Sequence, residues 1–409
     1  MMNLFNKLSS LKNVSEDVTL NILASLLSTG VMQFVLYPQL AIRLGDELYG
    51  EMLTVMGIVS ILSLSLGNNL CNARIILNEK YKEKSIVGDF QVLAFFSVVI
   101  TFLILGIANI FFKWRPWMFV GIVAAASLIS LKSYYLVAYR IDINYKKNLY
   151  ANVVMAIFYI LGAFVLIRFL DWPWLFTIPC LMVLIYIYFS SSILKEPFKT
   201  TTYFKSSSNV VLMLILSGLI GNVTLYLDRL IVYPILGGSS VSYYTVAAFF
   251  SKSFSIILLP ISSVVLTYIA SEKIKMNKRR FNQVNLILLP FILLFLLLSV
   301  TLGPYVTKFL YPMLIESSTQ YIFLASLGVI IGTAVIFNGT VVLAKAPSYW
   351  QVILSGTKLL VYFVLCLLLV RSHGIYGLCI GIIITNLVSL IMNWMVGSYY
   401  LDHGGIEKA

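Results

Sequence analysis

Residues 349–400 of this chain read YWQVILSGTKLLVYFVLCLLLVRSHGIYGLCIGIIITNLVSLIMNWMVGSYY. Apart from the short polar turn RSHG at 371–374, this stretch is almost wholly apolar. Each side of the turn is long enough for one helix through a bilayer, which needs ~20 apolar residues. Backbone N–H and C=O groups in hydrocarbon must be paired within their own segment, so helices are expected. The stretch therefore predicts two consecutive transmembrane helices, 348–370 and 374–400.

The rest of the chain has the same character. Of its 409 residues, 60% are hydrophobic and 11% are charged, whereas soluble domains contain ~45–50% apolar and ~25% charged residues. This composition predicts an all-α polytopic membrane protein with about 12 transmembrane helices. The other ten spans are expected near 18–42, 52–77, 91–112, 117–139, 149–170, 174–194, 210–235, 241–270, 283–303 and 320–344.

The distribution of charge predicts the orientation of the chain. With the N-terminus inside and the spans alternating, nineteen of the 29 Lys and Arg residues fall inside, seven fall outside and three lie within spans. Such an asymmetry follows the positive-inside rule, with both termini cytoplasmic. The cluster EKIKMNKRR at 272–280 is then a topology signal and a contact for anionic membrane lipid. The net charge of +13 is explained in this way, and no nucleic-acid partner is expected.

A faint internal repeat suggests two halves. YPQLAIRLGDELYG at 37–50 and YPILGGSSVSYY at 233–244 share Tyr-Pro, then Leu-Gly, then a Tyr after a polar turn. The alternative is that such pairs recur by chance at membrane interfaces. Six predicted spans on each side of the connecting loop would give both halves one orientation, as in transporters built from parallel repeats. We therefore expect an N-terminal six-helix lobe at 1–194, a cytoplasmic linker at 195–209 and a C-terminal six-helix lobe at 210–409.

Cationic residues inside the spans are the best candidates for a binding site, because a charge costs ~2.5–3.5 kcal/mol at the bilayer centre. Lys252 and Lys358 lie near the middle of their spans, too deep to reach water easily. Lys132 lies less deep, and Arg74 is near the predicted cytoplasmic end. Snorkelling towards water is therefore the alternative explanation for Lys132 and Arg74.

Tyrosines on the lysine-bearing faces predict a polar lining. Tyr135, Tyr139, Tyr244 and Tyr362 recur near the lysines at helical spacing, and they are candidates for contacts with sugar or for gating. The Ser and Gly residues on the same faces are equally explained by helix packing.

No Asp or Glu is expected deep in a span. The nearest acid is Asp228, beside Arg229 towards the outer end of its helix, where the two residues form an ion pair, an interface anchor or both. Lysines without a matching acid attract an anion, and ammonium groups bind phosphate or pyrophosphate as point charges.

An enzyme embedded in the membrane is the other class of protein to consider. Glycosyl or phosphoryl transfer needs paired carboxylates, a metal-binding acidic motif or a base with an orienting partner, but the acids here are scattered over loops. There is no GxxxxGK[ST] phosphate loop. We expect no catalysis, no cofactor and no metal site.

Three segments resemble a known family. YPQLAIRLGDELYG with GNNLCNARI at 67–75, the segment LYLDRLIVYPILGGSSVSYYTVAAFFSKSFSIILLPISSV at 225–264, and HGIYGLCIGIIITNLVSLIMN at 373–393 are similar to polysaccharide-transport and O-antigen flippases. These belong to the multidrug/oligosaccharidyl-lipid/polysaccharide (MOP) exporter superfamily. The resemblance implies a MATE-like architecture, with twelve helices in two six-helix lobes around a cavity that opens to each side in turn.

The resemblance also implies a substrate. The family moves a polyprenyl-pyrophosphate-linked oligosaccharide from the cytoplasmic to the outer leaflet of a bacterial inner membrane, for O-antigen, capsule or exopolysaccharide synthesis. Its cationic cavity residues would correspond here to Lys252, Lys358, Lys132 and Arg74. Expected partners are the undecaprenyl-pyrophosphate-linked oligosaccharide, membrane lipid, a polysaccharide polymerase and a chain-length regulator. The alternative is a cation-coupled multidrug exporter, although the missing buried carboxylate departs from that branch. A third branch of the superfamily contains the lipid-linked peptidoglycan precursor flippases. This chain has two spans fewer than we expect of that branch, which argues against it.

Overall fold

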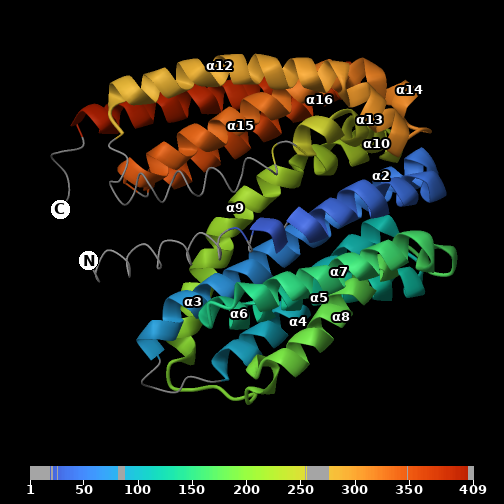
Figure 1. The fold of residues 1–409 in the computed structure, drawn as a ribbon, viewed down its shortest axis with the longest axis vertical. Coiled ribbons are helices and arrows are strands. Elements are labelled where there is room, and N and C mark those ends of the chain that lie inside the picture. Colours follow the sequence, from blue (N-terminus) through green and yellow to red (C-terminus); the bar gives the residue numbers. More distant parts are fainter. Residues whose placement is uncertain are drawn as a thin grey trace, which may run out of the picture. The chain divides into compact units, whose positions relative to one another are not determined.

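The computed structural model describes residues 19, 22–24, 26–81, 88–253, 255, 276–347 and 349–403, and every regular element in them is helical (Figure 1). The first half contains η1 Met32–Leu36, α2 Tyr37–Ser63, η2 Leu64–Asn68, α3 Asn69–Tyr81, α4 Asp89–Phe112, α5 Pro116–Tyr135, α6 Val137–Ile141, α7 Tyr145–Phe164, η4 Leu166–Arg168, α8 Trp174–Ser190 and η5 Ile193–Lys195. The second contains α9 Phe204–Leu236, α10 Gly238–Ala247, α12 Lys278–Thr301, α13 Gly303–Leu310, α14 Ile315–Ser318, η6 Thr319–Tyr321, α15 Ile322–Lys345 and α16 Tyr349–His403.

Eight helical stretches in the described residues are long and apolar enough to cross a membrane. Two of them, Ile22–Asn78 and Tyr349–Asp402, contain 57 and 54 residues. At 1.5 Å per residue each would be ~80 Å long, far more than the ~30 Å of hydrocarbon. Each of the two contains a glycine with non-helical backbone angles, Gly45 and Gly374, that divides it. The predicted all-α polytopic architecture is therefore confirmed. The predicted span 241–270 falls largely on residue 254 and residues 256–275, outside the described residues.

The chain divides into two compact units. The first comprises residues 1–43 and 55–222, and the second comprises residues 44–54 and 223–409. In the first unit α5 packs against α4 and α8, and α7 packs against α8. In the second, α15 packs along α16 and α12 lies against both of them (Figure 1). The predicted lobe limits at 1–194, 195–209 and 210–409 stay a prediction.

The two repeated sequence segments share an unusual backbone conformation. Gly45 has φ 73° and ψ 179°, and Gly237, which also follows a Leu, has φ 82° and ψ 178°. Side chains with a Cβ rarely adopt such a positive φ. Both glycines turn the chain sharply between two helical segments, so the faint repeat in the sequence corresponds to a repeated corner in the structure.

Within the second unit these two corners are joined by hydrogen bonds. The Glu47 carboxylate accepts from the backbone N–H groups of Gly238 and Ser239, both at 2.9 Å, and from the Ser239 hydroxyl at 2.8 Å. A carboxylate there satisfies N–H groups that have no partner at the start of α10 and complements the helix dipole. Asp46 accepts from the Tyr243 hydroxyl at 2.6 Å. Acids from the first corner therefore hold the beginning of α10.

The connection between α8 and α9 is attached to the first unit. Asp89 is fully buried, and its carboxylate accepts from the backbone N–H and the hydroxyl of Thr201, at 2.6 and 2.7 Å. The Gln91 side chain donates to the Ile193 carbonyl at 2.6 Å. An ideal Cβ on Gly88 would lie 2.4 Å from the Lys199 carbonyl oxygen, so this approach requires glycine. These contacts fix the path of the connection.

Candidate functional site

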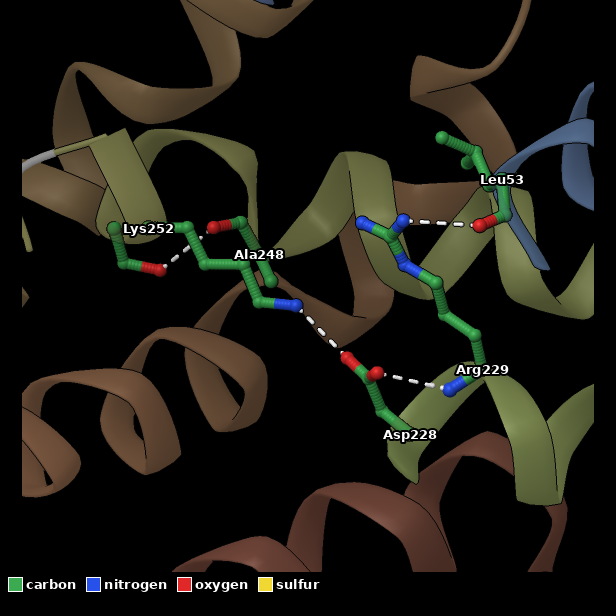
Figure 2. Close-up of polar contacts among 6 residues, drawn as sticks. Leu53, Asp228, Arg229, Ala248 and Lys252 are labelled. Carbon is green, nitrogen blue, oxygen red and sulfur yellow. Dashed lines mark hydrogen bonds and ion pairs between the residues drawn. The ribbon is translucent and has the colours of Figure 1, made fainter. Parts of the chain in front are cut away.

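A buried carboxylate on α9 is the centre of the candidate site. Asp228 is 3% exposed, and its Oδ2 accepts from the Lys252 ammonium at 2.8 Å. Its Oδ1 accepts from the Arg229 backbone N–H at 2.9 Å. Lys252 lies in the helical residues that follow α10, where its own backbone N–H donates to the Ala248 carbonyl (Figure 2). One helix therefore supplies the acid and the next one the base.

This ion pair corrects one expectation from the sequence. Asp228 was expected towards the outer end of its helix, and that depth stays a prediction; within the protein it is almost completely buried. Lys252 was expected to have no matching acid, and that expectation is wrong, because Asp228 neutralises it. The physical reason is that an uncompensated charge is expensive to bury, and a carboxylate on a neighbouring helix removes most of that cost.

Arg229 adds a second cation to the cluster. Its guanidinium donates to the Leu53 carbonyl at 3.0 Å and lies 5.7 Å from the centre of the Tyr226 ring. Leu53 belongs to the short segment 44–54 of the same unit. The predicted Asp228–Arg229 neighbourhood exists, but the arginine head group binds a backbone carbonyl while the carboxylate binds Lys252 (Figure 2).

Aromatic side chains complete the cluster. The Lys252 ammonium lies 5.0 Å from the centre of the Tyr244 ring, within the range of a cation–π interaction. The hydroxyls of Tyr244 and Tyr362 are both buried and within electrostatic reach of the Asp228 carboxylate. The structure thus gathers five of the ten predicted residues around one carboxylate: Asp228, Arg229, Tyr244, Lys252 and Tyr362.

The net charge of this cluster follows from its members. Two cations, Lys252 and Arg229, surround one anion, Asp228. One-third of the Lys252 side chain is exposed, whereas Asp228 is covered. An ammonium has three N–H donors and no acceptor. The cluster is therefore positive overall, and both of its cations are partly exposed.

Lys358 forms no ion pair with this cluster. It lies on α16 and is partly buried. Within the described residues it has neither a hydrogen bond nor an ion pair. Its ammonium is thus a cation within the second unit without an acid from the described chain.

The first unit contains the other predicted residues. Lys132 on α5 donates to the Met155 sulfur at 3.6 Å and has no carboxylate partner in the described part of the chain. The Tyr135 hydroxyl donates to Gln91 at 2.6 Å. Tyr139 is hydrogen-bonded to Ser190. Both tyrosine hydroxyls are therefore engaged within this unit.

Arg74 has a structural partner. Its guanidinium lies 2.8 Å from the Glu196 carboxylate and 5.0 Å from the centre of the Phe90 ring, and it is 9% exposed. Burial raises the pKa of Glu196, and the neighbouring Arg74 charge opposes that rise only in part. Arg74 therefore does not simply extend to water, as the snorkelling alternative required. It attaches the α8–α9 connection to α3.

Two acids that the sequence did not single out are important in the structure. Glu196 pairs with Arg74, and Glu47 holds the beginning of α10. Glu47 lies in the repeated segment GDELYG, opposite the Gly-Ser-Ser of the second repeat. The first copy of the repeat thus carries a carboxylate, and the second copy begins a helix whose first N–H groups need acceptors. This complementarity in the sequence could have indicated that Glu47 pairs with the start of α10.

Solved structures of similar fold include transporters and a flippase. No family model and no curated protein sequence matches the chain. Solved structures do match. A multidrug resistance MATE family transporter of the MOP superfamily, in an inward-facing conformation, superposes with a TM-score of 0.65 at 13% identity over 96% of each chain. The lipid II flippase MurJ, in an inward closed conformation, gives 0.65 at 15% identity over 94% of this chain and 86% of its own.

A Vibrio cholerae MATE transporter, VcmN in its bent form, gives a TM-score of 0.59 at 13% identity over 97% of this chain and 98% of its own. Superpositions of this extent establish a common fold, and identities this low leave the substrate open. The chain has the polytopic helical fold shared by MATE transporters and MurJ.

Proposed function

We propose that this protein is a flippase for a polyprenyl-pyrophosphate-linked oligosaccharide. By alternating access it would move the repeat unit from the cytoplasmic to the outer leaflet of a bacterial inner membrane, for O-antigen, capsule or exopolysaccharide synthesis. The observation that carries the proposal is the excess of positive charge inside the second unit. Lys252 and Arg229 outnumber Asp228, and Lys358 has no acid partner among the described residues.

The chemistry of this charge suits a pyrophosphate. Ammonium groups attract phosphate oxygens strongly in a low dielectric, and the attraction does not require one fixed orientation. Asp228 would hold the Lys252 head group in place while leaving part of it accessible. Tyr244 and Tyr362 are buried beside the cluster, so they would contact a sugar only in a conformation that exposes their rings. Lys132 is a further candidate in the first unit.

Other features of the chain agree with this proposal. MurJ, which shares the fold, is named as a lipid II flippase. The charge asymmetry predicts cytoplasmic termini. A polysaccharide polymerase and a chain-length regulator would be partners, because an exported repeat unit must next be polymerised. Membrane lipid and the undecaprenyl-pyrophosphate-linked substrate are the expected ligands.

A cation-coupled multidrug exporter is the second candidate, and Asp228 is the observation that favours it. A buried carboxylate is the group that would bind a proton or a cationic drug, and Asp228 is buried on α9. However, Lys252 already occupies one side of this carboxylate and Arg229 lies beside it. The carboxylate therefore contributes no net negative charge to the cluster, which is why we rank this candidate second.

The test is complementation of surface-polysaccharide export in a strain that lacks its own flippase. Lys358→Ala removes the cation without disturbing an ion pair in the described structure, and Lys308→Ala, at an exposed lysine of α13, is the matched control. At equal membrane levels, we expect Lys358→Ala to lower export at least tenfold and Lys308→Ala to leave it unchanged. Full export by Lys358→Ala would refute the cationic site. Drug resistance without any polysaccharide phenotype would establish the exporter instead.

A further inference from the structure

A groove on the surface of the second unit lies between α12 and α16. Its volume is about 350 Å³, and it is lined by Asn282, Asn285, Leu286 and Leu289 of α12 and by Leu390, Ile391 and Trp394 of α16. Leu286, Leu289 and Ile391 are 65%, 55% and 53% exposed. In a helix that crosses a membrane, such side chains contact lipid hydrocarbon. The groove is therefore a cleft that faces lipid, with apolar walls.

One end of the groove is polar. The Asn282 Oδ1 accepts from the Trp394 indole N–H at 3.0 Å. Asn285 accepts from the Asn338 amide at 2.8 Å and donates to the Phe281 carbonyl at 3.0 Å. Within the described residues the N–H groups of the Asn282 amide have no partner, so they remain available to a ligand. An indole at such a boundary is typical of the level of the lipid head groups.

A cation lies one helical turn beyond this polar end. Arg279 precedes Asn282 by three residues and Leu286 by seven, so the three residues share one face of α12. Arg279 is exposed and forms no ion pair with any described residue. Its neighbour Lys278 is paired with Asp402 at the end of α16. The charge in line with the groove is therefore that of Arg279.

We propose that this groove binds one anionic glycerophospholipid. The phosphate would be held by the Arg279 guanidinium and the Asn282 amide, and an acyl chain would lie along Leu286, Leu289 and Ile391. From Asn282 to Leu289 the helix rises ~10 Å. The walls of the groove would therefore cover the part of the acyl chain that is nearest the lipid head group. The proposal concerns a resident lipid and does not depend on the transported substrate.

The selectivity follows from the same arrangement. Apolar walls accept the acyl chain of any phospholipid, whereas the basic residue favours a head group of net negative charge. A basic residue near a membrane surface contributes about a fivefold preference for anionic lipid. Phosphatidylglycerol should therefore bind about fivefold more tightly than phosphatidylcholine with identical acyl chains.

Native mass spectrometry of the delipidated full-length protein, titrated with each of these two lipids, tests the proposal. The wild type should retain one phosphatidylglycerol with the stated preference. Arg279→Gln should bind both lipids equally, and Leu286→Trp should lose both because the indole fills the groove. The matched controls are Arg371→Gln, at an exposed arginine of α16, and Leu360→Trp, at a leucine 65% exposed on the same helix. Both controls should bind as the wild type does.

Three outcomes of these titrations with the two phospholipids would overturn the proposal. They are equal binding of the two lipids by the wild type, an unchanged preference in Arg279→Gln, and unchanged binding by Leu286→Trp. Should Leu286→Trp fail to fold, as judged by circular dichroism and gel filtration, Ile391→Trp fills the groove from the opposite wall. Displacement of phosphatidylglycerol by a polyprenyl pyrophosphate at equal concentration would also overturn it, since the groove would then belong to the substrate.

Discussion

The carboxylate of Asp228 and the ammonium of Lys252 lie 2.8 Å apart on successive helical segments of the second unit. Asp228 is almost completely buried, whereas a third of the Lys252 side chain is exposed. The two ends of this ion pair therefore have different roles. The acid is a fixed part of the protein interior, and the lysine can also interact with a ligand.

Removing Lys252 alone should destabilise the protein. Lys252→Met leaves the Asp228 carboxylate buried without its ammonium, and loss of one partner of a buried pair costs about 3–5 kcal/mol. We expect the lower end of that range, because Arg229 still lies beside the carboxylate and Lys252 is partly exposed. The measurement is the free energy of unfolding in detergent or lipid.

The double variant Asp228→Asn/Lys252→Met separates the ion pair from simple loss of packing. It removes both charges and should recover most of the lost stability. The free energy of unfolding is measured for this double variant and for Asp228→Asn and Lys252→Met alone. If the loss in the double variant equals the sum of the two single losses, the two charges do not interact.

Glu47→Ala should weaken the beginning of α10. The carboxylate accepts three hydrogen bonds there, and removal of a capping side chain costs about 0.5–2 kcal/mol. Glu316→Ala, at an exposed acid in the first turn of α14, is the matched control and should stay within about 0.5 kcal/mol of the wild type. Equal effects of the two substitutions on thermal unfolding would show that the cap does not stabilise α10.

Gly237→Ala should be more harmful than an alanine substitution inside a helix. At φ 82° and ψ 178° a Cβ is strained whatever space surrounds it, and such a strained backbone costs about 1–3 kcal/mol. Gly106→Ala in α4, where nothing lies within 4 Å of the added Cβ, should be neutral or stabilising by up to about 1 kcal/mol. Thermal unfolding of both variants measures the contrast. An unchanged melting temperature for Gly237→Ala would mean that the corner does not need a positive φ.

The pH dependence of stability should show the burial of Glu196. Burial raises its pKa in the folded protein, and Arg74 lowers it to a smaller extent. A carboxyl group with a raised pKa binds its proton more tightly when folded, so its contribution to stability is full below the unfolded pKa of 4.5 and falls as pH rises through the folded pKa.

Glu196→Gln removes this dependence. The melting temperature of Glu196→Gln relative to the wild type should therefore increase as the pH rises from about 4 to 8. Glu316→Gln, at an exposed acid, is the control. A difference between Glu196→Gln and the wild type that decreases with pH would show that the Arg74 charge outweighs the burial.

The hydrophobic pattern predicted the helices well. The turn expected at 371–374 coincides with the break at Gly374, and the expected span 91–112 matches α4, which runs from Asp89 to Phe112. Hydrophobicity and length are local properties that each segment carries independently of the others. The repeat was visible for a similar reason, because a Leu-Gly corner needs a positive φ, and glycine is the residue that provides it.

The partners of the charged residues were not predictable in this way. Lys252 was predicted to be a cation deep in its span, but its pairing with Asp228 depends on two helices facing each other across a connection. The partner of Arg74 is Glu196, on a connection that the sequence indicated only as a linker. The spacing of residues in the sequence shows which side chains share a face of one helix. These ion pairs instead join residues of different segments, so the spacing could not predict them.

The sequence by itself determined a bilayer-embedded chain of helices with positive charge in several of its spans. It could do so because each span must satisfy its own backbone hydrogen bonds and cover its own surface with apolar side chains. Only the tertiary structure decided how those charges are compensated. Lys252 is neutralised by Asp228, Arg74 by Glu196, and Lys358 by no described residue. The cost of burying a charge depends on what the rest of the protein places around it, and that is a property of packing.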